Sequence, residues 1–195
     1  MKTDVIVISN SGNNMEKVLN QVDALAVYQV LSPEDAMHLR LLAEETMAMM
    51  RAITGEVNGE FWIQNQDNVY ELHLKVDTLT DEKKREQLLS ASSSGKNEAT
   101  RGFMGKLRAF FQPTADAPMF TSGFAGGAPQ MYGSYEWSME DYREQLRQHR
   151  EQNERGAQEA WDELEKSVVS HVADDVKVSI LGRVVEMTII KAMTR

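Results

Sequence analysis

The first half of the chain alternates between helical and extended patterns of apolar residues. Residues 5–8 are four consecutive apolar residues, which predicts a short buried strand. Residues 15–26 then carry apolar positions at helical spacing. A second helix is predicted from about residue 33 to residue 53, because Ser32–Asp35 combines a capping serine, a proline at the first helical position and an acid at the third. The expected core stripe of this helix is Ala36, Leu39, Ala43, Met47 and Met50.

Two β-hairpins are predicted from strict alternation of apolar and polar residues. The first covers residues 59–77 and turns at residues 66–68. The second covers residues 176–190 and turns about Gly182.

The segment between the hairpins has a more varied composition. Residues 81–89 suggest a short charged helix, and residues 112–137 are rich in Gly, Pro and aromatic residues with few charges, which predicts a long loop. Residues 139–172 are predicted to form one long charged helix, with Gly156 as its weak point. The aromatic residues of the loop either cover the domain's own core or meet a partner, including a second copy of the chain.

The order of elements predicts a single α/β domain over residues 1–195. Helices without strand–helix–strand alternation favour an α+β two-layer sandwich, in which a mixed or antiparallel sheet is covered on one face. The loop and charged helix at about residues 112–166 are expected to be an insertion in this domain.

Composition excludes several classes of function. The formal net charge is −9, and no basic cluster interrupts it, so neither a nucleic-acid footprint nor docking on an anionic membrane is expected. The absence of cysteine excludes disulfides, thiolate catalysis and cysteine-type zinc sites. The short apolar run near the N-terminus fits no signal peptide, and we expect a cytoplasmic protein without a membrane span.

Catalytic motifs are not evident in the sequence. The four histidines, at positions 38, 73, 149 and 171, share no metal-ligand spacing, so each is interpreted as a surface or core histidine and no metal site is predicted. A nucleophile elbow, a Walker loop and a dinucleotide-binding fingerprint are all missing from the chain.

One stretch of the sequence nevertheless resembles a known superfamily. Ser32–Ala36, then Leu39–Glu45, then a hairpin ending at Asp77, are similar to the GHKL (histidine kinase-like) ATPases, and closest to the small bacterial anti-sigma-factor serine kinases. The resemblance covers about residues 5–107 and, more weakly, 174–191. It implies a Bergerat-type mixed sheet with helices on one face. It also implies an opening strand, a helix, a capped helix with Glu-x-x-x-Asn, a hairpin, an Asp-x-Gly-x-Gly box, a lid and closing strands.

The resemblance assigns roles to individual residues. Glu45 matches the catalytic glutamate, which acts as base or orients the nucleophile, and Asp77 matches the aspartate that contacts adenine. Gly102, Gly105 and Lys106 correspond to a remnant of the second glycine box around the phosphates. Met49, however, stands where the family has the asparagine that holds Mg²⁺, and residues 77–81 lack both glycines of the first box.

These departures from the motifs of the superfamily determine which function we expect. We expect a signalling regulator that binds a protein partner and whose binding of ATP is weakened or lost, because a thioether is a poor ligand for Mg²⁺. The chain would then be a pseudoenzyme with degenerate nucleotide motifs. Two alternatives stay open: an active ATP-binding serine-protein kinase, and a structural or assembly protein that uses the aromatic loop.

Overall fold

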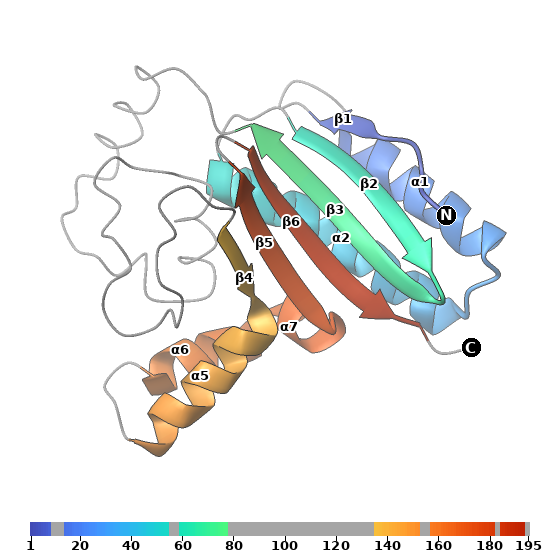
Figure 1. Ribbon diagram of the computed structural model, residues 1–195. Helices are drawn as coiled ribbons and strands as arrows, with labels where there is room; N and C mark the ends of the chain where they lie inside the picture. The colour runs from blue at the N-terminus through green and yellow to red at the C-terminus, as the bar shows by residue number, and fades with distance from the viewer. Residues whose placement is uncertain (9–13, 55–58, 78–134, 153–156, 182–183, 194–195) are drawn as a thin grey trace.

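Figure 1 shows the computed structural model, which describes residues 1–8, 14–54, 59–77, 135–152, 157–181 and 184–193, without the side chains of residues 49–54, 77, 135, 180 and 181. The elements, in chain order, are β1 (Ile6–Ile8), α1 (Asn14–Tyr28), α2 (Pro33–Thr54), β2 (Gly59–Gln66), β3 (Val69–Asp77), β4 (Tyr135–Ser138), α5 (Met139–Glu151), α6 (Ala157–Lys166), α7 (Val168–Val172), β5 (Asp175–Leu181) and β6 (Val184–Ala192).

The described strands form one sheet of six in the order β1-β2-β3-β6-β5-β4. Both predicted hairpins belong to it, and they join where β3 pairs with β6 along their whole length. All five pairings of the described strands are antiparallel. The α+β class is therefore confirmed, whereas the mixed sheet is wrong for these strands. The hairpins account for part of this, since a two-residue connection can join only antiparallel strands.

Helices α1 and α2 lie behind the sheet in Figure 1 and cover one of its faces. Alternate residues of the strands point into this layer and are buried, as the register requires. The buried residues of β2 and β3 on this face are Phe61, Ile63, Tyr70, Leu72, Leu74 and Val76. Those of β5 and β6 are Val176, Val178, Val185, Met187 and Ile189.

The start of α2 follows the predicted capping pattern. The Ser32 hydroxyl accepts a hydrogen bond from the backbone N–H of Asp35 at 3.1 Å and donates one to the Asp35 carboxylate at 2.9 Å. Leu39, Ala43 and Met47 are fully buried in the core, as the stripe predicts. Leu42 is also fully buried, so the buried face of the helix is wider than the stripe.

The first hairpin turns through two residues with positive φ, Asp67 at 51° and Asn68 at 65°. Two consecutive left-handed residues are typical of a type I′ turn, whose twist matches that of the flanking strands. Asp and Asn tolerate this conformation better than other non-glycine residues, which explains why the turn falls where the sequence predicts it.

Two predictions for the second half of the chain are wrong. Residues 135–137, expected to belong to the loop, form edge strand β4 together with Ser138, and this strand pairs with β5. The expected single helix over residues 139–172 is three helices, α5, α6 and α7. Ser138 ends the strand and caps α5, since its hydroxyl accepts a hydrogen bond from the Asp141 N–H at 3.1 Å. The short helix expected at residues 81–89, and the aromatic loop up to residue 134, lie outside the described residues.

Candidate functional site

The catalytic position implied by the resemblance lies on α2, which packs against β3 and β6. Glu45 is half-buried there. The next residue of the helix, Thr46, is fully buried, and its hydroxyl donates to the Leu42 carbonyl at 2.6 Å. Met49 follows Glu45 by one turn in the same helix, as the spacing requires, although its side chain is outside the described part.

The remaining nucleotide residues are only partly placed. Asp77 is the last residue of β3 and pairs with Val184 of β6. The Asp77 carboxylate is not among the described side chains. Gly102, Gly105 and Lys106 belong to residues 78–134, which lie outside the described residues. The structure therefore places Glu45 and Asp77 on adjacent layers and leaves the predicted adenine and phosphate contacts without a test.

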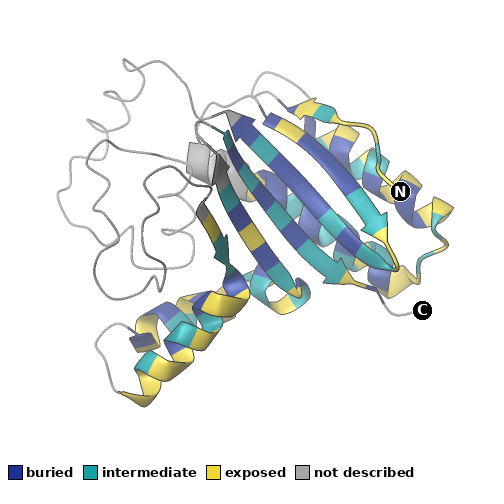
Figure 2. Cartoon of the chain, in the orientation of Figure 1, coloured by how far each residue is buried: buried dark blue, intermediate teal, exposed yellow. Residues whose placement is uncertain are grey.

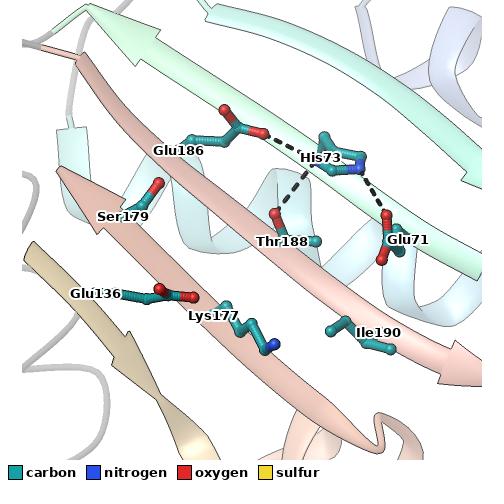
Figure 3. A pocket seen from close by; sticks show the side chains of 8 residues that line it. All are labelled: Glu71, His73, Glu136, Lys177, Ser179, Glu186, Thr188 and Ile190. Carbon is teal, nitrogen blue, oxygen red and sulfur yellow. Dashed lines mark hydrogen bonds and ion pairs between the residues drawn. The ribbon is translucent and has the colours of Figure 1, made fainter. Parts of the chain in front are cut away.

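A second polar site, which sequence reasoning missed, lies on the sheet face opposite α1 and α2. It is a shallow depression of about 250 Å³ across β3, β6, β5 and β4. Figure 3 shows its side chains, which come from the strand positions that alternate with the buried core. They are Glu71, His73, Glu136, Lys177, Ser179, Glu186, Thr188 and Ile190.

The register aligns these residues in rows across the sheet. One row runs from Trp62 through His73 and Thr188 to Lys177, and the next runs through Glu186 and Ser179 to Glu136. Directly opposed side chains in neighbouring strands lie about 5 Å apart, so residues remote in sequence become neighbours.

His73 is the centre of the depression, with polar partners on both ring nitrogens (Figure 3). Its Nδ1 lies 2.9 Å from a Glu186 carboxylate oxygen and 3.2 Å from the Thr188 hydroxyl. Its Nε2 lies 3.4 Å from a Glu71 carboxylate oxygen. The contact of Nδ1 with Glu186 is a hydrogen bond, whereas the Glu71 oxygen lies only at ion-pair distance and the buried Nε2 has no hydrogen-bond partner among the described residues.

The Trp62 indole stacks on the face of the His73 imidazole. The two rings are parallel within 6°, with centroids 4.8 Å apart. The Lys2 ammonium lies 4.5 Å from the centroid of the indole. Trp62 and His73 are 7% and 8% exposed, so this pair is buried on a face that no described helix covers. The arrangement holds a nearly buried imidazole against the indole and between carboxylates on this face of the sheet.

Two further features, a metal-binding cluster and a membrane-spanning helix, are not found in the described part of the chain. It contains no group of three His, Asp or Glu side chains able to hold a metal ion. None of its helices is long and apolar enough to cross a membrane.

Comparison with known proteins adds no relative. The chain matches no family model, no curated protein and no solved structure.

The His73 site was missed for a physical reason. Alternation along β3 shows that Glu71, His73 and Lys75 share the face opposite Leu72 and Leu74. The register between β3 and β6, which brings Glu186 to His73, is a long-range property and leaves no local signal.

Proposed function

We propose that the chain is a regulatory domain of the anti-sigma-factor serine-kinase kind, which binds a protein partner and binds Mg²⁺-ATP weakly or not at all. The observation that supports this most is the order of the described elements. Strand β1, helix α1, capped helix α2, hairpin β2–β3 and closing strands β5–β6 follow the order that the resemblance implies.

Helix α2 supports the loss of nucleotide chemistry. Glu45 and Met49 are four residues, about one helical turn, apart in one continuous helix. At that spacing, the residue four positions after the glutamate would have to supply an oxygen to the metal that bridges the phosphates. Met49 offers sulfur, a soft ligand that Mg²⁺ does not favour.

The sheet face that no described helix covers supports the partner-binding part of the proposal. It carries a rigid stacked pair, Trp62 and His73, surrounded by carboxylates and by Lys177. Charged groups around a fixed aromatic centre give specificity and orientation to a protein interface. Nothing in this arrangement requires a nucleotide.

The test is a calorimetric titration of the full chain with ATP, with Mg²⁺ present and after its chelation. We expect a dissociation constant of about 1 mM or weaker, equivalent to about −4 kcal/mol, with no gain from Mg²⁺. Tight binding that depends on Mg²⁺, with transfer of phosphate to a serine-containing partner, would favour the active kinase with Glu45 as the base.

A further inference from the structure

Large apolar side chains that are exposed gather in one region of the molecule. Of the eight found in the described part of the chain, seven belong to residues 1–37, and only Val168 lies elsewhere. The seven are Met1, Val5, Val7, Val27, Tyr28, Val30 and Met37. Their concentration in and before β1, around the end of α1 and at the start of α2 is typical of a protein interface rather than of scattered surface residues.

Strand β1 is one edge of the described sheet. Its backbone pairs with β2 on one side, and no described strand pairs with it on the other (Figure 1). Natural edge strands are usually protected by charges, by proline or by a bulge. Residues 5–8 have no charge and no proline, and Val5 and Val7 are 46% and 67% exposed.

The first residues of the chain are protected in a way that residues 5–8 are not. Lys2 pairs with Gln64, whereas Ile6 pairs with Phe61, so the edge contains one extra residue between these two points. Such a bulge interrupts the pairing surface. The side chain of Gln21 also donates to the Asp4 carbonyl at 2.7 Å and occupies it. The unprotected edge therefore begins at Val5.

The end of α1 extends the apolar surface beside this edge. The Gln29 side chain lies 3.2 Å from the sulfur of Met1, which brings the helix end to the start of the chain. Next to it, Val30 has φ of 53° and is 88% exposed. Glycine normally occupies this position after a helix, because a β-branched residue is strained there. Figure 2 shows exposed residues along β1 and at the turn after α1.

We propose that a second copy of this chain pairs with β1 in antiparallel fashion, joining two sheets edge to edge about a two-fold axis. An antiparallel pair of identical strands needs only a strand that complements itself. Four uncharged β-branched residues fulfil this condition, and like charges would not. The chain has a net charge of −9, and residues 5–8 add no charge of their own to such a contact. This inference does not depend on the proposed function.

The test is the oligomeric state of the full chain, measured by analytical ultracentrifugation over the micromolar range. We expect a dimer whose dissociation constant rises at least tenfold in Val7→Lys. Val168→Lys is the matched control, since it places the same charge on an exposed valine outside this region, and it should leave the dimer intact. A monomeric wild type, or a dimer that Val7→Lys leaves unchanged, overturns the proposal.

A second measurement, by cross-linking, tests the same pairing even if the lysine variant folds poorly. The chain has no cysteine, so Val7→Cys introduces a single thiol. A short bismaleimide should link two copies of Val7→Cys and should fail to link two copies of Val168→Cys. Equal linkage of the two variants, or none for Val7→Cys, contradicts pairing along β1.

Discussion

Trp62 and His73 face each other across β2 and β3 as a directly opposed pair, with their rings parallel within 6°. Each is more than nine-tenths buried. The imidazole lies between two carboxylates, Glu71 and Glu186, so the stacked pair stands at the polar centre of the sheet face that no described helix covers.

Substitution of His73 should separate the aromatic contribution from the polar one. His73→Phe keeps a ring on Trp62 and removes the contacts to the carboxylates. It should lower the free energy of unfolding by about 1 kcal/mol, since Glu71 and Glu186 are exposed enough to be hydrated. His73→Ala also loses the stack and should cost about 2–3 kcal/mol. Urea unfolding measures both, and equal losses in the two variants would show that the stack contributes nothing.

Val30→Gly should stabilise the protein. The N–H groups of Val30 and Leu31 close the end of α1 by bonding to the carbonyls of Val27 and Ala26, which is a Schellman motif with Val30 at the left-handed position. Glycine removes the strain of a β-branched residue there, a gain of about 1 kcal/mol.

Val27→Gly is the matched control, because Val27 is equally exposed but lies within α1. It should destabilise the protein by a few tenths to about 1 kcal/mol. Both are measured by urea unfolding. If both glycines lower the free energy of unfolding, the left-handed conformation of Val30 is not under strain.

Stability should fall in alkaline solution because of Tyr142. Burial, with a smaller contribution from the nearby Glu163 carboxylate, raises the pKa of Tyr142 to about 12 from an ordinary value of 10.0. Between these pH values the unfolded chain has released a proton that the folded chain still holds, so unfolding becomes easier as the pH rises. Tyr142→Phe should show a shallower decline over the same range. Parallel curves for the two proteins would contradict a raised pKa.

Local patterns predicted the parts of the fold whose causes are local. Ser32 and Asp35 are three residues apart, and the hydrogen bonds that start α2 join these two residues. The turn at Asp67 and Asn68 likewise depends on two neighbouring residues that tolerate positive φ. In both cases the sequence contained the complete interaction.

Two features that depend on distant partners were not predicted. Strand β4 has only four residues, and its pairing with β5 joins Trp137 to Val178, forty-one positions away. Its brief alternation was hidden in an aromatic segment. The contact between His73 and Glu186 depends on a register across 113 residues. Of the nucleotide residues inferred by resemblance, Glu45 is the one whose side chain the structure describes, and the roles of all of them stay predictions.

The most direct test of the account is the Mg²⁺ dependence of ATP binding in three proteins: the wild type, Met49→Asn and Ala48→Asn. Ala48 is an exposed neighbour on the same helix, so its variant controls for an added amide. We expect that Mg²⁺ does not improve ATP binding by the wild type or by Ala48→Asn, and that Met49→Asn, which restores an oxygen ligand, gains about tenfold in its presence, or about 1.4 kcal/mol. Low-micromolar, Mg²⁺-dependent binding by the wild type would contradict it.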